Sequence, residues 1–355
     1  MSTDYGQVLA PVVTSWKASA IAESTKTTYL RNLKHWVLFC TAINLPNIWI
    51  DELVPREQAT VMAWFAIDCG LYGNNKKQEG NQYATYLNKK AAVKWAHRHY
   101  RDAILHLEGA TLTLVEAAYK RNKNNPRPKK PCTPRMLLRC REELRSSPGG
   151  ALAWGVFLLQ YFFLGRGGEF WATDNARDGT AQAQCDHRIQ WQDVILQDRN
   201  GNTVHWSDSE HAYQVQLTFN HAKADQAGRG DVITLGSSGH PILCPVRGAI
   251  LALKSRESWK PKTPTNALSG GIKATYITGL LKRAAEAEGI DSADIAGHSV
   301  RIGYATALFE AGFDELVIRL AGRWSSEAVA RYTRVSGKVL LSAPRDVLGC
   351  LLKSM

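Results

Sequence analysis

Apolar side chains recur every three or four residues through most of the first 120 positions, the spacing that one face of a helix requires. Ser24 or Thr25 can cap the first such helix, and Pro55 suits the first turn of the second. Breaks at Asn74-Asn75 and Gly80 precede a longer helix. The predicted helices cover about residues 25–40, 55–67, 82–107 and 112–120.

Beyond residue 132 the pattern changes from helical to alternating and back again. Thr133 or Pro134 can open a helix, and Gly149-Gly150 separates it from a strongly apolar second helix. Together with the strands that follow, these segments predict a mainly α fold with a small antiparallel β-sheet. The predicted segments are helices over residues 134–144 and 151–164, strands over residues 189–196, 213–219 and 231–235, a turn at Asn200-Gly201, and helices after Pro245 broken at Gly289, Gly312 and Gly337.

A basic, proline-rich segment separates the two halves. Seven Lys and Arg and no acidic residue lie between Lys120 and Arg135, and four prolines keep this stretch extended. We therefore expect a helical domain over residues 1–120, a linker over 121–132 and a second domain over 133–355. The net charge is +12, and residues 1–132 hold 18 Lys and Arg against 10 Asp and Glu. Such an excess suits a polyanion, although a solvated linker or a nuclear import signal explains the run equally well from charge alone.

Composition excludes secreted and membrane-spanning classes. The first ten residues are polar and lack an early Lys or Arg, and the longest apolar stretch, Ala151–Leu164, is too short to span a bilayer. The seven Cys are scattered and never spaced C-x-x-C, which argues for reduced thiols and against a zinc site. We expect an intracellular protein, in the nucleus of a eukaryote or otherwise in the cytoplasm or nucleoid.

Four polar clusters place charge where packing does not call for it. The first ends the apolar helix with Arg166 at a glycine-flanked turn, where Glu169 is close enough to orient it. The second, residues 221–230, lies between two predicted strands and carries Lys223 at its rim. The third begins a helix, so that His298 and Arg301, three residues apart, share a face.

The fourth cluster is Gly322-Arg323-Trp324, and Tyr332 follows it with an arginine on each side. Gathered in one place, the four clusters can transfer a phosphodiester of DNA. Two arginines can clamp its non-bridging oxygens, and a tyrosine hydroxyl can attack to form a phosphotyrosyl ester. A lysine can protonate the departing oxygen and a histidine can handle the proton of the nucleophile. Side chains supply all the positive charge, so no metal or other cofactor is expected.

These clusters resemble the active site of the tyrosine recombinases, the phage-integrase family. The resemblance covers nearly the whole chain: residues 24–39 resemble the start of the family's core-binding domain, and residues 131–137 the start of its catalytic domain. The loop 223–230 and the Gly-Arg-Trp sequence are most similar to recombinases of eukaryotic mobile elements. The residues that carry the resemblance are, in chain order, Arg166, Lys223, His298, Arg301 and Tyr332.

The resemblance implies a fold, a reaction and a set of roles. A helical core-binding domain and an integrase-like α+β catalytic domain would clamp duplex DNA. Tyr332 would attack the scissile phosphate, leaving a 3′-phosphotyrosyl bond and a free 5′-hydroxyl. The family works as a homo-tetramer on two DNA sites, without a cofactor, because the ester conserves the bond energy. The catalytic residues it implies are Arg166, Lys223, His298, Arg301, Trp324 and Tyr332, with Glu169 and Arg323 as supporting residues.

Two features depart from the commoner family pattern. A His or Trp usually follows the glycine that corresponds to Gly322 directly, whereas here Arg323 does and Trp324 comes next. Trp324 is the preferred equivalent, because an indole N–H can donate to a phosphate oxygen. The Gly167-Gly168 pair is also more flexible than is usual. An inactive DNA-binding relative therefore stays open as an alternative. A type IB topoisomerase also stays open, because it shares this chemistry.

Two further predictions concern the competing tyrosine and the DNA contacts. Tyr304 is expected to serve in packing, since it lies only three residues after Arg301. Duplex DNA is the expected partner, and no membrane is expected. For each cation on a predicted helix face the ordinary alternative is a merely solvated side chain. The candidate DNA contacts are Lys26, Arg31, Lys89, Lys94, Arg98, Lys123, Arg127, Lys129 and Lys130.

Overall fold

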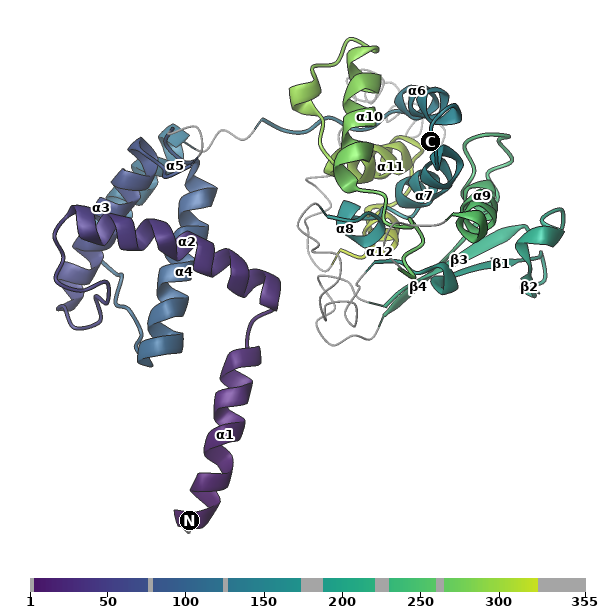
Figure 1. Ribbon diagram of the computed structural model, residues 1–355. Helices are drawn as coiled ribbons and strands as arrows, with labels where there is room; N and C mark the ends of the chain where they lie inside the picture. Colours follow the sequence, from purple (N-terminus) through teal and green to yellow (C-terminus); the bar gives the residue numbers. More distant parts are fainter. Residues whose placement is uncertain are drawn as a thin grey trace, which may run out of the picture. The chain divides into compact units, whose positions relative to one another are not determined.

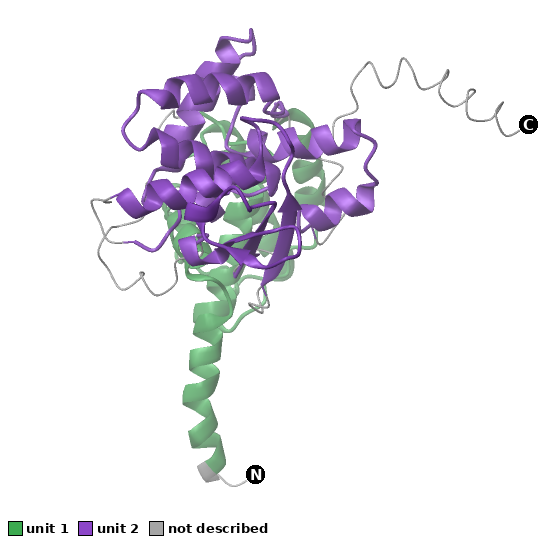
Figure 2. Cartoon of the chain, turned by 90° about the vertical axis from the view of Figure 1, so that its right-hand side faces the viewer, with its two compact units in different colours: residues 1–126 green, residues 127–355 purple. Residues whose placement is uncertain are grey.

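The computed structural model describes residues 3–75, 79–123, 127–173, 188–220, 230–259 and 265–324. The chain divides into two compact units, Met1–Pro126 and Arg127–Met355 (Figure 2). Their boundary lies inside the segment 121–132 that we expected to be a linker. Both units are rich in helix and the second adds a small antiparallel sheet, which confirms the predicted fold class (Figure 1).

Unit 1 is helical, and several of its helix ends differ from the prediction. The helix predicted over residues 82–107 ends at Arg101, and the one predicted over 55–67 runs on to Leu71. The second helix begins at Glu23 behind Ala22, which has no side chain able to cap, so the predicted cap at Ser24 or Thr25 is wrong. The last helix runs on to Lys123, three residues into the predicted linker. The first helix was not predicted. The helices are α1 (Thr3–Ser19), α2 (Glu23–Ala42), α3 (Pro55–Leu71), α4 (Tyr83–Arg101) and α5 (Ala110–Lys123).

Aromatic side chains from three helices form the centre of the unit 1 core. The rings of Trp36 and Phe65 meet edge to face with their centroids 5.0 Å apart, and the centroid of the Tyr86 ring lies 6.4 Å from that of Phe65. All three rings are buried. The buried polar ends are bonded, since the Trp36 indole donates to the carbonyl of Ile48 at 2.9 Å. Packing of apolar faces, rather than capping, therefore holds α2, α3 and α4 together.

Unit 2 contains the second set of helices and the sheet. Its first helix is capped by the Thr133 hydroxyl, which accepts from the Met136 amide at 3.2 Å, as the sequence predicted. The helices are α6 (Pro134–Arg145), α7 (Gly150–Phe162), α8 (Gly167–Phe170), α9 (Pro245–Ser258), α10 (Ala274–Glu286), α11 (His298–Glu310) and α12 (Glu315–Ala321). The strands are β1 (Val194–Gln197), β2 (Thr203–Val204), β3 (Gln214–Phe219) and β4 (Asp231–Gly236).

The four strands form one antiparallel sheet in the order β2-β1-β3-β4. Side chains of β3 alternate between buried and half-buried, because its neighbours β1 and β4 hold it in register over one packed face. The last pair of the β3–β4 ladder is Phe219 opposite Asp231. The two ends of the connection that contains Lys223 therefore lie side by side.

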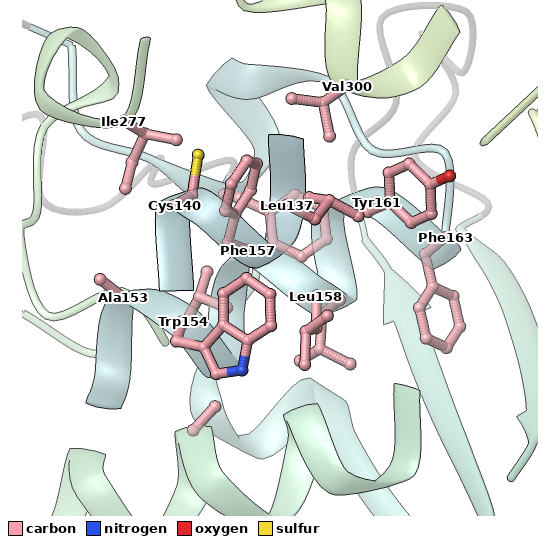
Figure 3. Packing of buried hydrophobic residues seen from close by; sticks show 14 of the residues in the cluster. Leu137, Cys140, Ala153, Trp154, Phe157, Leu158, Tyr161, Phe163, Ile277 and Val300 are labelled. Atoms are coloured by element: carbon pink, nitrogen blue, oxygen red, sulfur yellow. The ribbon is translucent and has the colours of Figure 1, made fainter. Parts of the chain in front are cut away.

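Helix α7 is the centre of the unit 2 core (Figure 3). Nearly all of its residues are buried, because α6, α9 and α11 pack around it. A Cβ on Gly155 would lie 2.6 Å from the α9 backbone, so glycine here lets the two helices meet closely. This burial fixes the C-terminal end of α7, from which Arg166 projects. No helix in the described part of the chain is long and apolar enough to cross a membrane.

Candidate active site

The turn that carries Arg166 begins where α7 ends. The amides of Leu164 and Gly165 bond back to the carbonyls of Tyr161 and Gln160, at 3.2 and 2.8 Å. This pair of hydrogen bonds closes a helix and normally places glycine in the left-handed position, which Leu164 occupies here with φ 51°. A Cβ on Gly165 would lie 2.2 Å from the Phe170 ring. The glycine before Arg166 is therefore needed for internal packing, whereas Gly167 and Gly168 border open space.

Glu169 binds Arg166 twice. The Arg166 backbone amide donates to Glu169 Oε2 and its guanidinium NH1 donates to Oε1, both at 2.8 Å. Helix α8 is a single turn, so the carboxylate is held directly over the start of that turn. The Glu169 side chain is buried, while a quarter of the Arg166 side-chain surface is exposed. The pair thus fixes one end of the guanidinium and leaves part of it accessible.

The first turn of α11 contributes the second arginine. His298 is the first residue of the helix and is exposed, and Arg301, one turn later, is 1% exposed. The Arg301 guanidinium donates to the carbonyl of Gly322 and lies 4.5 Å from the centre of the Trp324 ring. A guanidinium over an indole is an attractive cation–π arrangement. Arg301 is thereby tied to the chain that follows α12.

That chain places two further side chains next to the arginines. Trp324 packs into a small apolar cluster with Leu164, Ala305 and Ile318. Arg323 turns the other way, so that its NH2 donates to Glu169 Oε2 at 2.9 Å. Its guanidinium carbon lies 3.3 Å from the centre of the Phe219 ring. Trp324 therefore contacts Arg301, and Arg323 shares the carboxylate that binds Arg166.

The shared carboxylate stays ionised. Burial by itself would raise the pKa of Glu169, but the charge of Arg323 and the hydrogen bonds from Arg166 outweigh it and hold that pKa below its ordinary value of 4.5. Burial lowers the pKa of the Arg323 guanidinium, and the Glu169 charge opposes that shift. An arginine remains protonated under these conditions. The site therefore holds two arginines on one buried negative charge.

Two of the predicted catalytic residues, Lys223 and Tyr332, lie outside the described residues. The sequence interpretation missed Phe219, although its place at the end of the strand before Lys223 was available as a signal. Phe219 lies under the Arg323 guanidinium. The competing tyrosine, Tyr304, packs against the rings of Tyr161 and Phe162 at 5.1 Å each, and burial raises its pKa. This environment suits the packing role that we expected for Tyr304.

Lys89 corrects one predicted DNA contact. Its side chain is buried, and the ammonium donates to His35 Nδ1 at 2.7 Å, to the Gly73 carbonyl at 2.9 Å and to Asn81 Oδ1. An ammonium with three protein acceptors has no donor left for a phosphate. The other unit 1 candidates reach the surface to different degrees. Arg31, Arg98 and Lys123 are exposed, whereas Lys26 and Lys94 are half-buried.

Three of the linker cations are bound within unit 2. Arg127 pairs with Asp291 at 2.9 Å and with Asp294 at 3.0 Å. Lys130 pairs with Asp294 at 3.1 Å, and the Lys129 ammonium donates to the carbonyl of Ala293 at 2.6 Å. The basic run therefore has less unpaired charge than the sequence suggests, because acids about 160 residues away neutralise part of it.

Among the described residues, one group of three possible metal ligands lies close together: His35, Asp68 and Cys69 in unit 1. The Lys89 ammonium already lies 2.7 Å from His35 Nδ1 and supplies a positive charge there. Burial raises the pKa of the Cys69 thiol to about 12, so the thiolate that a metal requires is disfavoured. The cluster is thus better suited to the lysine than to a metal ion.

No family model matches this sequence, and no curated protein matches it. Solved structures do match. The chain is similar to the XerH site-specific recombinase bound to a palindromic difH substrate in a post-cleavage complex, with a TM-score of 0.57 and 13% identity over 90% of this chain and 78% of that one. It is also similar to the Tn1549 transposon integrase in complex with transposon right-end DNA, with a TM-score of 0.54 and 15% identity over 95% and 99% of the two chains. The chain has the tyrosine recombinase fold.

Proposed function

We propose that this protein is a site-specific DNA recombinase that cleaves and rejoins duplex DNA through a bond between Tyr332 and a 3′-phosphate. The observation that carries the proposal is that Arg166 and Arg301, from two different elements, are both tied to residues 322–324. Arg301 donates to the Gly322 carbonyl, and Arg166 shares Glu169 with Arg323. This brings two guanidinium groups to the chain segment that continues, eight residues later, to Tyr332.

Two arginines suit the charge of the reaction. A phosphodiester carries one negative charge, and attack by an oxygen nucleophile places more charge on its non-bridging oxygens in the transition state. A guanidinium offers several donors in a fixed plane that can bind two such oxygens. Glu169 holds the Arg166 guanidinium by one nitrogen, so the group is oriented before the DNA binds. The Trp324 ring, whose centre lies 4.5 Å from the Arg301 guanidinium, orients the second guanidinium through a cation–π contact.

The proposed cleavage step balances as follows. The Tyr332 oxygen forms a bond to phosphorus, and the bond from phosphorus to the 5′ oxygen breaks. The tyrosine proton passes to His298, which is exposed at the first turn of α11. Lys223 gives a proton to the leaving 5′ oxygen. Both ends of its loop lie at the Phe219–Asp231 pair, and Phe219 is under Arg323. Rejoining is the same step in reverse. It requires no cofactor, because the phosphotyrosyl ester keeps the energy of the phosphodiester bond that was broken.

The solved neighbours support duplex DNA as the partner. Both are recombinases in complex with DNA, and one of these is a post-cleavage complex. The exposed cations of unit 1, Arg31, Arg98 and Lys123, would then contact phosphates. As the resemblance implies, the active assembly would be a tetramer on two DNA sites. The candidate DNA contacts retained from the sequence are these three with Lys26, Lys94, Arg127, Lys129 and Lys130.

Covalent trapping tests the proposal. Duplexes taken from the DNA that flanks the gene are nicked a few nucleotides to the 3′ side of each candidate cleavage position, so that the short fragment bearing the freed 5′-hydroxyl diffuses away. The wild-type chain should form a protein–DNA adduct that survives denaturing electrophoresis, and Tyr332→Phe should form none because only the attacking oxygen is removed. Tyr304→Phe is the matched control: it removes the same oxygen from a packed ring and should leave the adduct at wild-type amounts.

The outcomes separate the three candidate functions. A Tyr332→Phe variant that still forms the adduct would refute the proposal. A wild-type chain that binds a flanking duplex tightly without forming an adduct would support the inactive DNA-binding alternative. Adduct formation on any duplex, with relaxation of supercoiled DNA and without site preference, would support a topoisomerase instead.

A further inference from the structure

The end of α12 is built against the usual preference for glycine. The amides of Arg323 and Trp324 bond back to the carbonyls of Leu320 and Arg319, both at 3.0 Å, which closes the helix. The residue after the helix cap must then be left-handed, and glycine adopts that conformation most cheaply. Here Gly322 has an ordinary φ of −82°, and Arg323 takes the left-handed position with φ 54°. Gly322 therefore lies one residue before the position at which the left-handed backbone would favour a glycine.

Trp324 explains why glycine stands at 322. A Cβ at that position would lie 2.2 Å from the Trp324 ring. The ring thus requires glycine at 322, but nothing in the backbone requires arginine at 323. A strained conformation that persists at one residue points to a use for that residue's side chain.

The Arg323 side chain is buried at a further cost. Its side chain is 4% exposed, and within the described residues its Nε and NH1 have no hydrogen-bond partner. Within the described residues, NH2 donates to Glu169 Oε2, and the guanidinium also lies against the Phe219 ring. An apolar side chain would fill the same space without burying unpaired donors. Local stability therefore does not explain why this position holds an arginine.

Glu169 connects Arg323 to Arg166. Its Oε2 accepts from the Arg323 guanidinium and from the Arg166 backbone amide, and its Oε1 accepts from the Arg166 guanidinium. If Arg323 moves, the carboxylate loses one of its three donors, and both Arg166 contacts must readjust. The same displacement shifts the backbone between Arg323 and Trp324, whose ring lies on the Arg301 guanidinium.

We propose that Arg323 is a positioning residue. Through Glu169, which it meets from 154 residues away, it sets the guanidinium of Arg166. The arginine that receives the phosphate is thereby placed by a buried ion pair. This inference rests on the proposed function for its catalytic consequence, but the mechanical link from Arg323 to Arg166 does not depend on it.

The experiment compares Arg323→Met, Arg323→Lys, Glu169→Gln and the double variant Arg323→Met with Glu169→Gln. Arg319→Met, in the last turn of the same helix, is the matched control because it also removes an arginine charge. Two quantities are measured on each: the single-turnover rate of adduct formation on the nicked duplex, and the hydrogen exchange of the peptide that contains residues 164–170. A peptide from α6 is the internal reference for overall stability.

We expect Arg323→Met to slow adduct formation by about 100-fold, the size of effect that a small misplacement of a reacting group produces. The amide of Arg166 should exchange at least tenfold faster, with α6 unchanged. Arg323→Lys, which keeps the charge, should recover part of both losses. The double variant should be no slower than Glu169→Gln alone, because both changes act through one carboxylate.

Two results would overturn the inference. The first is an Arg323→Met chain with wild-type exchange in residues 164–170, whatever its activity; if its cleavage were slowed as well, Arg323 would be a direct contact of the DNA. The second is an additive double variant. A failure of the proposed function looks different: the wild-type chain forms no adduct, while the exchange of Arg166 still responds to Arg323→Met.

Discussion

Within the described residues, each unit buries a network of charged side chains, and these two networks differ in how completely their donors are used. In unit 1 the Lys89 ammonium donates to three acceptors, and His35, one of these, lies 2.8 Å from Asp68 through its other nitrogen. In unit 2 Arg166 and Arg323 share Glu169, but two nitrogens of Arg323 have no partner within the described residues.

We interpret the difference as the one between a network that serves the fold and a network that serves the proposed reaction. Unpaired buried donors cost free energy, so a network that serves only the fold is completed by its own side chains. The Lys89 ammonium meets this condition, since all three of its donors are used and two of them tie α4 to the connection between α3 and α4 at Gly73 and Asn81. The Asp68 carboxylate of the same network does not meet it, because within the described residues its Oδ2 has no hydrogen-bond partner. The arginine network does not meet it and keeps Arg166 partly exposed. Unused donors beside a partly exposed Arg166 are expected of a network whose arginines are kept for the proposed reaction rather than for stability.

Replacement of Arg166 should give the largest contrast. Arg166→Lys keeps the charge but loses the planar fork, and we expect adduct formation to fall by about 100-fold to 1000-fold. The melting temperature should change by no more than about 2 °C, because the side chain is partly exposed. Arg145→Lys, at an exposed surface pair with Glu142, is the control. If Arg166→Lys lowered the melting temperature and left cleavage intact, the two networks would be of the same kind.

Replacement of Lys89 should show the opposite pattern. Lys89→Met leaves the acceptors of His35, Gly73 and Asn81 buried without their donor, and we expect it to lower the free energy of unfolding by about 3 kcal/mol. Urea unfolding of the full chain, with hydrogen exchange in α4 peptides as the readout, measures this loss of free energy. The folded fraction should cleave DNA at the wild-type rate. Lys94→Met, on the half-buried side of α4, should change stability by less than about 0.5 kcal/mol.

A loss of DNA affinity in Lys89→Met at unchanged stability would contradict this assignment. It would mean that the ammonium leaves its three acceptors to meet a phosphate, as the sequence alone suggested.

The two networks should also respond to acid at different pH. Burial, and then the charge of Lys89, lowers the pKa of His35 below 6.5, so its neutral form stabilises unit 1 fully above about pH 6.5. This contribution is lost as the pH falls from 6.5 toward the lowered value. The lowered pKa of Glu169 makes its contribution complete above 4.5 and lost only below that. Unit 1 peptides should therefore lose exchange protection before unit 2 peptides between pH 6.5 and 5.

His35→Gln sharpens the acid prediction. A glutamine amide can accept from Lys89 and donate to Asp68 without titrating, so the pH dependence of unit 1 should become weaker. It should not vanish, because His97 is also buried with a lowered pKa and accepts from the Ile50 amide at 3.0 Å. An unchanged slope in His35→Gln would show that the lysine network does not titrate with this histidine.

The smallest effect concerns the surface cations. Lys123→Gln removes an exposed charge at the end of α5, and the slope of log affinity against log salt should fall by about one. Arg127→Gln should change the slope less, because Asp291 and Asp294 already neutralise that guanidinium. Fluorescence anisotropy with one labelled duplex at several salt concentrations measures both. Equal slopes for the two variants would mean that DNA displaces the aspartates.

Much of the fold follows from local pattern. The Thr133 cap, the break at Gly149-Gly150 and the alternation before Phe219 were predicted because each depends on neighbours within a few residues. His298 was likewise expected at a helix start, and α11 begins there. The resemblance carried Arg166 and Arg301 into one site, and the structure ties both to residues 322–324.

Lys89 shows where the local pattern was misinterpreted rather than silent. Tyr86, Lys89, Val93 and Ala96 are spaced by three or four residues, so the lysine lies on the apolar stripe of α4. The cluster of cations around it suggested a solvated face instead. The three-to-four-residue spacing of the buried positions indicated correctly that Lys89 is buried, whereas the number of neighbouring cations suggested the wrong interpretation.

By itself, the sequence determined the two-part helical organisation, the small sheet and the residue types of the site, because hydrophobic period, caps and turns act over a few residues. Only the tertiary structure decided which charges are buried and what each one binds. Arg323 meets Glu169 from 154 residues away, and Arg127 meets Asp291 from 164. Such pairs form when packing of whole helices brings distant side chains together, and no short stretch of sequence carries that information.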